Sequence, residues 1–266
     1  MKIHSTAIVS DKAKLAEDVE VGPYAIIGDN VVIGQGTKIA GHSVIQGNTT
    51  IGANCDIFSF AAVGSNPQDL KFKGEKSFLE IGDNNVIREF CTLNPGTGEG
   101  GKTVIGSHNL FMAYAHVAHD CSVGSHCVIV NGGTLAGHVT VEDYVHISGF
   151  GAAHQFVRVG KYSILAGLSK AVQDVPPFSA CDGHPARLYG LNMVGLKRYN
   201  IPRESIKALG HAFKVLFNSG LPVKKAVIKL KEEKKPCAEV AYLLEFIDNS
   251  SRGICRSCRL PKRNVD

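Results

Sequence analysis

The stretch AYAHVAHDCSVG, residues 113–124, places His116, His119 and Asp120 among small residues and beside Cys121. Neutral imidazole accepts a proton near pH 7, and a carboxylate can fix its tautomer and stabilise the imidazolium. On a strand, however, His119 and Asp120 would point to opposite faces. Histidines from adjacent chains could instead bind zinc, although H-x-x-H is a weak metal motif on β structure. No serine or cysteine lies in an obvious nucleophile turn. If the chain catalyses a group transfer, the group would therefore pass directly between substrates, without a covalent enzyme intermediate.

The composition limits the class of protein. The 266 residues suffice for a sizeable core, and no apolar run reaches the roughly 18–20 residues that a membrane span needs. The N-terminal stretch has no long apolar segment, so we expect no secretory signal, reduced thiols and a cytoplasmic protein. Residues 1–186 carry 12 Lys and Arg against 17 Asp and Glu, whereas residues 187–266 carry 17 against 7. The basic C-terminal part indicates either an acidic partner or ordinary solvated helix surface.

A six-residue repeat of apolar positions extends from Ile3 to Ala171. A helix would give a period of 3.6 and an isolated strand a period of 2, so short strands joined by tight corners are indicated. This pattern predicts a β-helix in which three hexads form one triangular coil. The positions are Ile3, Val9, Leu15, Val21, Ile27, Ile33, Ile39, Ile45, Ile51, Ile57 and Val63, then Ile81, Ile87 and Leu93, then Ile105, Phe111, Val117, Val123, Ile129, Leu135, Val141, Ile147, Ala153, Val159, Leu165 and Ala171.

Four residues after most of these positions comes a second, usually small residue, which would fit near a corner of the prism. Cys55, Cys91, Cys121 and Cys127 occupy this inward position, so we interpret them as buried small hydrophobic residues. Twenty-six hexads correspond to about nine coils. The handedness of the coil does not follow from the repeat.

From about residue 187 the apolar spacing becomes helical. The segment 201–220 has Pro202 at its start, Gly220 at its end and an apolar face between them, and two further helical segments follow. We therefore predict a hexapeptide-repeat β-helix over residues 1–186, with loop insertions near 64–80 and 94–104. A basic α-helical domain over 187–256 and a flexible tail over 257–266 complete the prediction.

The repeat also predicts which residues share a face, because hexads three apart lie on the same side of the prism, one coil further on. The hexads that begin at positions 117, 135 and 153 carry His119, His138 and His154, so these histidines should line one edge region. His116 lies at the corner that leads into the first of these hexads.

Both loop insertions would leave the prism at the face of the histidines. Loops on a rigid scaffold often carry binding residues. Asp69 and Lys71 would then lie over the histidines of this subunit or of a neighbour.

Several segments occur in an order that resembles one bacterial enzyme family. They are NPQDLKFKGE, AHVAHDC, TLAGHV, AAHQF, AVQDVPP and GLNMVGLKR, followed by a helical tail. Over residues 1 to about 256 the chain thus resembles the UDP-N-acetylglucosamine O-acyltransferases (the LpxA family), which act first in the synthesis of the lipid A of lipopolysaccharide. The resemblance implies a left-handed parallel β-helix, a homotrimer with active sites between subunits, and no cofactor or metal. It implies general-base transfer of an (R)-3-hydroxyacyl chain from acyl carrier protein to the 3-hydroxyl of UDP-N-acetylglucosamine.

The resemblance also implies roles for individual residues. His119 matches the family's general base, Asp120 the support of its imidazolium, and Gly137 the backbone donor to the developing oxyanion. Gly167 matches the position that limits acyl-chain length, where glycine leaves room for a long chain. The basic C-terminal segment would bind the acidic acyl carrier protein, and no nucleic acid is implied. Contacts to the sugar, phosphate or acyl group match Asp69, Lys71, His116, His138 and His154, and contacts to the nucleotide match Gln155, Asn192 and Arg198.

The chain departs from the family pattern at two places in the nucleotide stretch. Val194 replaces an acid and Tyr199 an arginine, so the contacts to the uridine diphosphate stay open. The choice between an ester and an amide acceptor also stays open, because some members acylate a 3-amino sugar. Cys255 and Cys258 form a lone C-x-x-C, which we do not expect to bind zinc.

Three alternatives remain at this point. A zinc-dependent hexapeptide-repeat carbonic anhydrase would have histidines that bridge subunits and would contain stoichiometric zinc. A non-enzymatic scaffold would have no reason to stack histidines under two loops. A sister N-acyltransferase would be expected to carry an extra N-terminal domain, whereas here the hexads begin at Ile3.

Overall fold

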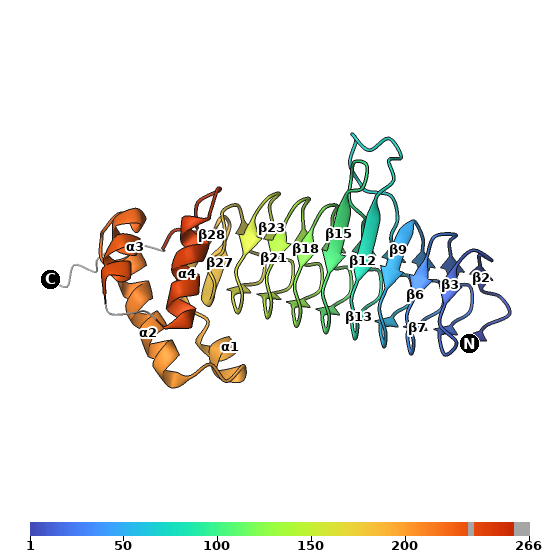
Figure 1. The fold of residues 1–266 in the computed structure, drawn as a ribbon, viewed down its shortest axis with the longest axis horizontal. Helices are drawn as coiled ribbons and strands as arrows, with labels where there is room; N and C mark the ends of the chain where they lie inside the picture. Colours follow the sequence, from blue (N-terminus) through green and yellow to red (C-terminus); the bar gives the residue numbers. More distant parts are fainter. Residues whose placement is uncertain (234–236, 258–266) are drawn as a thin grey trace.

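The computed structural model describes residues 1–233 and 237–257 and shows an elongated prism with a helical domain at its C-terminal end (Figure 1). Most strands of the prism are two residues long, because each one fills one side of a coil before the chain turns a corner. Strands of successive coils pair in parallel, as in β17 with β20. The β-helix predicted from the hexads is therefore confirmed.

Three sheets form the sides of the prism, and the nine strands of sheet B correspond to the predicted nine coils. Sheet A contains β1 (Lys2–Ile3), β4 (Glu20–Val21), β7 (Lys38–Ile39), β10 (Asp56–Ile57), β13 (Val86–Ile87), β16 (Leu110–Phe111), β19 (Val128–Ile129), β22 (His146–Ile147) and β25 (Ile164–Leu165). Sheet B contains β2 (Ile8–Val9), β5 (Ile26–Ile27), β8 (Val44–Ile45), β11 (Ala62–Val63), β14 (Thr92–Leu93), β17 (His116–Val117), β20 (Thr134–Leu135), β23 (Ala152–Ala153) and β26 (Lys170–Ala171). Sheet C contains β3 (Lys14–Leu15), β6 (Val32–Ile33), β9 (Asn48–Ile51), β12 (Phe78–Ile81), β15 (Lys102–Ile105), β18 (Ser122–Val123), β21 (Thr140–Val141) and β24 (Arg158–Val159).

The repeated apolar side chains fill the prism. Ile27, Ile45 and Ile87 are at most 1% exposed. The four cysteines predicted to face inward are buried and unpaired. Burial raises the pKa of the Cys91 thiol to about 11 and that of Cys121 to about 12, so both stay protonated at neutral pH. This chemistry suits packing rather than reactivity.

The three corners of the prism have different compositions. We call the corner between sheets B and C the histidine corner, because His119, His138 and His154 follow strands of sheet B there. The tyrosine corner lies between sheets C and A and carries the stacked rings of Tyr144 and Tyr162. The corner between sheets A and B, which we call the Gly167 corner, carries a column of exposed aromatic rings.

Both predicted loops leave the prism at the histidine corner. Residues 64–77 connect β11 to β12, and residues 94–101 connect β14 to β15. Figure 1 shows them projecting from the side of the prism near β12 and β15. Beyond the loops the coils resume in phase, since β12 pairs with β9 and β14 pairs with β17.

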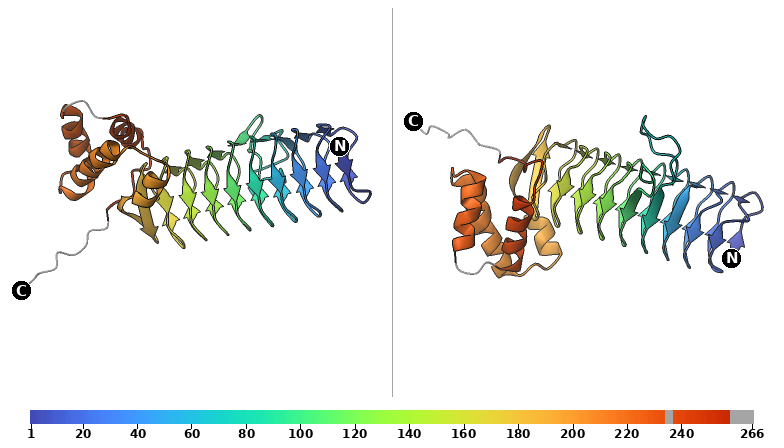
Figure 2. Two further views of the ribbon diagram at one scale, coloured as in Figure 1. Left: turned by 90° about the horizontal axis from the view of Figure 1, so that it is seen from below. Right: turned by 45° about the horizontal axis from the view of Figure 1, so that its top comes forward.

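The C-terminal end begins with an antiparallel hairpin that extends sheet A across the boundary expected near residue 187. The predicted helix over 201–220 corresponds to α2 and the π-helical turn η1, whereas the hairpin and α1 were not predicted. The elements are β27 (Ser179–Gly183), β28 (Ala186–Leu191), α1 (Met193–Arg198), α2 (Arg203–Phe213), η1 (Lys214–Asn218), α3 (Val223–Glu232) and α4 (Ala238–Asp248). Figure 2 shows the helices, in orange and red, gathered at one end of the prism.

Polar contacts attach the helices to the prism. The Tyr242 hydroxyl on α4 donates to Glu142 Oε2 at 2.5 Å, and the Lys161 ammonium lies 3.6 Å from the centroid of the Tyr242 ring. The Ser250 hydroxyl donates to the buried Asp174 carboxylate at 2.7 Å. None of the helices in the described residues is long and apolar enough to cross a bilayer. Cys258 and the rest of the predicted tail beyond Ser257 lie outside the described residues.

Candidate functional site

The histidine corner brings together residues from three successive coils, because β17, β20 and β23 are neighbours in sheet B. His119 is 8% exposed, and its imidazole meets that of His138 edge-on, with 5.2 Å between the ring centroids. The His138 ring in turn stacks on Phe156 at 4.6 Å. His154 lies one coil beyond His138 and is exposed.

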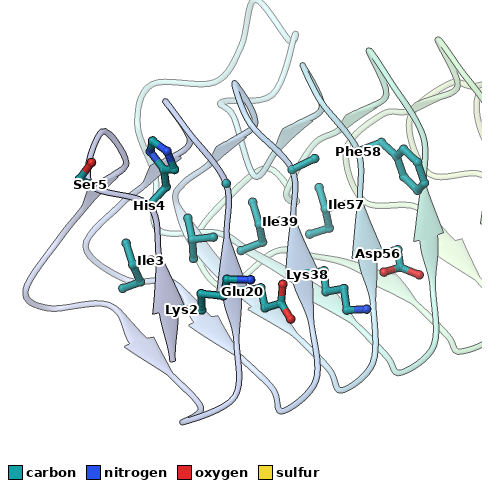
Figure 3. Close-up of a pocket in the computed structure, with 13 residues that line it drawn as sticks. Lys2, Ile3, His4, Ser5, Glu20, Lys38, Ile39, Asp56, Ile57 and Phe58 are labelled. Carbon is teal, nitrogen blue, oxygen red and sulfur yellow. The ribbon is translucent and has the colours of Figure 1, made fainter.

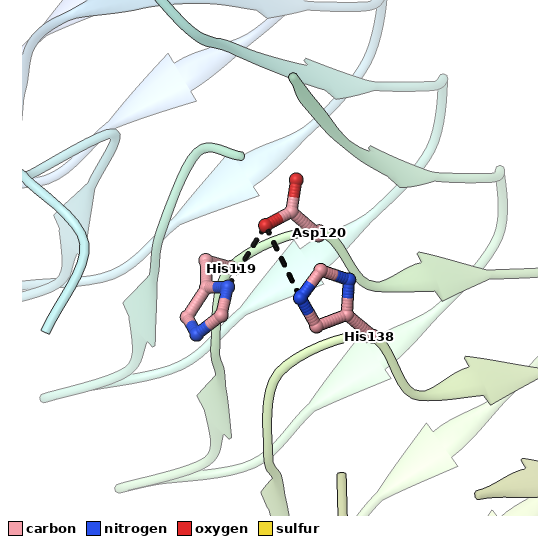
Figure 4. Close-up of side chains that lie close together, drawn as sticks. All are labelled: His119, Asp120 and His138. Atoms are coloured by element: carbon pink, nitrogen blue, oxygen red, sulfur yellow. Dashed lines mark hydrogen bonds and ion pairs between the residues drawn. The ribbon is translucent and has the colours of Figure 1, made fainter. Parts of the chain in front are cut away.

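His119 and Asp120 form a hydrogen-bonded pair although they are adjacent in sequence. Asp120 has left-handed backbone, with φ of +57°, which a short polar residue tolerates better than most. This corner conformation, unlike a strand, turns its carboxylate toward the same side as the histidine. Nδ1 of His119 lies 2.8 Å from Oδ2 of Asp120, so the neutral ring carries its proton on Nδ1 and leaves Nε2 as an acceptor (Figure 4).

Thr97, in the loop 94–101, holds the Asp120 carboxylate. Its hydroxyl donates to Oδ2 at 2.6 Å, and its backbone N–H lies 3.1 Å from both carboxylate oxygens. Burial raises the pKa of Asp120, but the hydrogen bonds from Thr97 and His119 outweigh it and hold that pKa below its usual value of 3.8. Asp120 is therefore charged at neutral pH and can stabilise an imidazolium at His119.

The first loop places Asp69 beside the other nitrogen of His119. Oδ2 of Asp69 lies 3.9 Å from His119 Nε2, and Oδ1 accepts a hydrogen bond from the backbone N–H of Lys71 at 2.9 Å. The Lys71 side chain is exposed and makes no ion pair within the described residues. An acceptor carboxylate thus lies beside the free nitrogen of the imidazole.

Gly137 lies directly beneath the His119 ring. A Cβ atom at this position would lie 2.5 Å from Cε1 and 2.6 Å from Nε2 of His119, closer than atoms can approach. The backbone N–H of Gly137 donates no hydrogen bond within residues 1–233 and 237–257. Gly137 thus brings a backbone donor without a partner in the described residues close to Nε2 of His119.

His116 differs from the other histidines because it lies within β17 rather than on the corner. Its Nδ1 lies 2.7 Å from the Thr92 hydroxyl. Burial lowers the pKa of His116 below 6.5, against the opposing effect of the Thr92 contact, and the nearby His119 adds to the lowering. The ring is thus neutral at pH 7.

His154 contacts the C-terminal segment. The Arg252 guanidinium lies 3.4 Å from His154 Nδ1 and also donates to the Val172 carbonyl at 3.3 Å. His154 Nδ1 lies 3.3 Å from the carbonyl of Gln155, whose side chain is exposed at the histidine corner.

Three of the predicted site residues lie away from the histidine corner. Asn192 caps α1, since its side chain accepts from Gly195 N–H at 3.0 Å and donates to the Tyr162 carbonyl at 2.9 Å. Arg198 ends α1 close to His146 of sheet A, where burial and the guanidinium charge lower the His146 pKa. Gly167 follows β25 on the Gly167 corner. Asn192, Arg198 and Gly167 therefore border sheet A, whereas the histidine corner is the vertex opposite to it.

The two departures from the family pattern lie near Arg198. Val194 is 70% exposed. The Tyr199 ring packs at a tilt against Tyr144 and Tyr162, with centroids 4.9 and 5.6 Å away. Tyr199 thus anchors α1 to the tyrosine corner.

Sequence reasoning missed Thr97 and Arg252. The loop that carries Thr97 was assigned to the correct corner, but nothing in NPGTGEGG indicates that its single hydroxyl reaches Asp120. Arg252 lies about a hundred residues from His154 in sequence, and only the fold of the C-terminal segment brings them together.

One group of donors could hold a metal ion. His119, Asp120 and His138 offer ligand atoms that all lie within 4.8 Å of one another (Figure 4). A separate hollow lies at the N-terminal end of the prism and is lined by residues such as Lys2, Glu20 and Lys38 (Figure 3). This hollow borders the first four strands of sheet A, far along the prism from β17, and has no part in the arrangement at the histidine corner.

Comparisons with known proteins identify the family. The model of the bacterial transferase hexapeptide (six repeats) matches residues 102–137, and the model of UDP N-acetylglucosamine O-acyltransferase, domain 2, matches residues 174–255. The acyl-[acyl-carrier-protein]–UDP-N-acetylglucosamine O-acyltransferase of Thiobacillus denitrificans is 52% identical over 96% of this chain and 99% of its own length. The enzyme of the same name from Aliarcobacter butzleri is 51% identical over 95% of this chain and 97% of its own length.

Solved structures agree with the sequence matches. LpxA from Acinetobacter baumannii superposes with a TM-score of 0.91 at 45% identity, over 96% of this chain and 99% of that one. LpxA from Bacteroides fragilis gives a TM-score of 0.93 at 40% identity, over 96% of this chain and all of that one. These neighbours confirm the left-handed parallel β-helix with its C-terminal helices. The chain is therefore a member of the UDP-N-acetylglucosamine O-acyltransferase (LpxA) family.

Proposed function

We propose that this chain transfers an (R)-3-hydroxyacyl group from acyl carrier protein to the 3-hydroxyl of UDP-N-acetylglucosamine, the first step of lipid A synthesis. The observation that carries the proposal is the His119–Asp120 pair, which leaves Nε2 free on a wall overhung by two loops, in a chain whose relatives are named for this reaction. The carbonic anhydrase and scaffold alternatives have no support from these relatives.

His119 acts as the general base. Nε2 takes the proton of the sugar 3-hydroxyl while its oxygen attacks the thioester carbonyl carbon, and the charge of Asp120 stabilises the imidazolium. The tetrahedral intermediate then expels the thiolate as the carbon–sulfur bond breaks, and the imidazolium returns its proton to that sulfur. The Gly137 N–H stabilises the oxyanion, because it is an unpaired donor beside the reacting centre.

Other residues of the histidine corner bind the substrate. Asp69 accepts hydrogen bonds from sugar hydroxyls next to Nε2, and Lys71 attracts the diphosphate from its exposed position on the loop. His116, His138 and His154 are suited to sugar, phosphate and acyl contacts from neighbouring coils.

The active site is shared between subunits of a homotrimer. Within one chain the nucleotide contacts, Asn192 and Arg198, and the chain-length position Gly167 border sheet A, and the prism separates them from His119. A cyclic assembly that sets the histidine corner of one subunit against sheet A of the next would join the two groups. Gln155 at the histidine corner would then also reach the nucleotide.

The outer face of sheet A and the Gly167 corner support this arrangement. From Val86 onward the outward side chains of sheet A are mainly apolar and half-buried, as at Leu110 and Val128. The Gly167 corner exposes Tyr114 by 63% and Phe150 by 67%. Apolar surface of this extent is a feature of protein interfaces.

Gly167 leaves room for the acyl chain. A Cβ atom there would meet only the Gly149 carbonyl, at 3.4 Å. The backbone does not require a glycine at this position, and its small size instead leaves space for the acyl chain. A larger residue would shorten the chain that fits.

The carrier protein is acidic, and the exposed lysines of α3, Lys224, Lys225 and Lys229, offer it a basic surface. Because this donor is cytoplasmic, we place the enzyme in the cytoplasm.

Product detection by mass spectrometry tests the proposal. The protein is mixed with UDP-N-acetylglucosamine, or with its 3-amino analogue, and with 3-hydroxyacyl carrier proteins of several chain lengths. Acylated nucleotide from the wild-type protein but not from a folded His119→Ala variant is the expected result, and the product identifies the acceptor and the chain length. Absence of product with every donor would overturn the proposal.

A further inference from the structure

The three donors at the histidine corner have the chemistry of a zinc site. His119 Nδ1 lies 2.8 Å from Asp120 Oδ2, and His138 Nε2 lies 3.8 Å from the same oxygen. The second distance is too long for a hydrogen bond. Tetrahedral zinc with ligands at about 2.0–2.1 Å would separate any two of them by about 3.4 Å, a value between the two observed distances. Zinc binding would therefore require small shifts of the Asp120 carboxylate and of the His138 ring, whose Nε2 lies within 4.8 Å of His119 Nδ1.

We propose that His119 Nδ1, His138 Nε2 and Asp120 Oδ2 bind one Zn²⁺ ion per chain, and that zinc bound there inhibits the enzyme. Two imidazoles and one carboxylate form a donor set that suits zinc better than magnesium or calcium. The His138 side chain is 39% exposed, so water can reach the fourth position.

The groups around these donors hold them in place. Thr97 donates its hydroxyl and its N–H to the Asp120 carboxylate, which fixes that ligand. Phe156 stacks on His138 with only 4° between the ring planes, which fixes the plane of the second imidazole. Metal ligands in proteins are commonly oriented by such outer contacts.

Zinc at Nδ1 would prevent His119 from acting as a general base, because Nε2 would then carry a proton. In the free enzyme the Nδ1 proton of His119 is directed to Asp120 and Nε2 accepts. When zinc occupies Nδ1, that proton is lost to solvent and Nε2 takes one, so the ring stays neutral but has no free lone pair at Nε2. The new Nε2–H faces Asp69 Oδ2, now 3.9 Å away, and gains a carboxylate acceptor of the kind that zinc-bound histidines usually have.

The binding half of the proposal stands independently of the proposed function, whereas the inhibition half rests on His119 as the base. Calorimetric titration of Zn²⁺ into the metal-stripped full-length protein, without substrates, tests the first half. One equivalent per chain is expected, with affinity at least about tenfold weaker in His138→Ala. The control is His126→Ala, because exposed His126 stacks on His108 at 4.8 Å and could bind zinc adventitiously. Zinc binding that is lost in His126→Ala but kept in His138→Ala would overturn the proposal.

Turnover in the presence of zinc tests the second half. Wild-type acyl transfer should fall as the site fills and return when a chelator is added, and His138→Ala should need at least about tenfold more zinc for the same fractional inhibition. Stoichiometric binding with undiminished turnover would refute the inhibition half while leaving the binding site in place. A protein that binds zinc as described but transfers no acyl group at any zinc concentration would instead refute the proposed function.

Discussion

The ring of His119 occupies the space that a side chain at position 137 would need. A methyl group on Gly137 would lie 2.5 Å from the imidazole and would push it outward by about 1 Å. Because displacement of this size can cost about a hundredfold in rate, we expect Gly137→Ala to lower kcat on that order while the protein stays folded. Steady-state kinetics with circular dichroism checks this prediction.

Gly210→Ala, on α2, is the control. A Cβ atom at Gly210 would meet nothing within 4 Å, and α2 lies in the helical domain rather than at the histidine corner. Its kinetics should resemble those of the wild type, and equal losses in both variants would show that the effect belongs to the backbone rather than to His119.

Thr97 should influence catalysis through Asp120. Thr97→Val removes the hydroxyl that donates to Asp120 at 2.6 Å, so the pKa of Asp120 should rise and the imidazolium should lose support. A hydrogen bond to a charged group contributes about 1.5–3 kcal/mol, and we expect kcat/KM to fall on the order of tenfold. Because the pKa of Asp120 rises, the acid side of the pH–rate profile should move to higher pH. Thr140→Val, in β21 of sheet C, is the control, and a similar loss there would contradict the specific role of Thr97.

At the residue scale the sequence indicated the histidines but not their contacts. The types and order of His119, Asp120 and His138 pointed to base chemistry, whereas the left-handed backbone at Asp120 that makes the pair possible has no signature in the hexad repeat. Thr97 and Arg252 reach the site only through folded loops, which carry no periodic pattern.

Burial of His116 in a strand of the prism makes the stability of the fold depend on pH. The pKa of His116 in β17 is below 6.5, so the unfolded state binds more protons than the folded state as the pH falls through 6.5. The stability that His116 contributes is present above pH 6.5 and is lost as the pH falls toward the folded-state pKa. His116→Asn should therefore flatten the dependence of Tm on pH between 7 and 5. A variant whose Tm falls as steeply as that of the wild type would contradict this account.

At the element scale the repeat predicted most of the prism. A period of six, kept in phase from Ile3 to Ala171, left one arrangement of short strands, and both loops were placed on the correct face. The hairpin β27–β28 and α1 were missed, because six to eleven residues carry too few apolar positions to distinguish an antiparallel strand or a single helical turn from a loop.

At the scale of the whole molecule, the prism carries a net negative charge and the C-terminal part a net positive one. Lys224 and Lys225 on α3 are exposed and should attract the acidic carrier protein. The double variant Lys224→Glu/Lys225→Glu should raise the KM for acyl carrier protein on the order of tenfold and leave the KM for the sugar nucleotide unchanged. Lys2→Glu/Lys38→Glu, at the opposite end of the prism, is the control. An unchanged KM for the carrier in the α3 variant would remove this surface from the docking site.

The assembly is the claim on which the account of the site depends. His119 and Arg198 lie on opposite sides of one prism, so the proposed function requires the histidine corner of one subunit and sheet A of another. His119→Ala and Arg198→Glu should each be nearly inactive alone, since each lacks one half of every site.

Co-expression of these two variants, with purification of the trimers that contain both, shows whether the site is shared between subunits. In every trimer that contains both variants, one of the three interfaces pairs an intact His119 with an intact Arg198, so about a third of the wild-type activity should return. If each site instead belonged to a single chain, no chain in the mixture would be intact. Mixed trimers without activity would contradict the shared site.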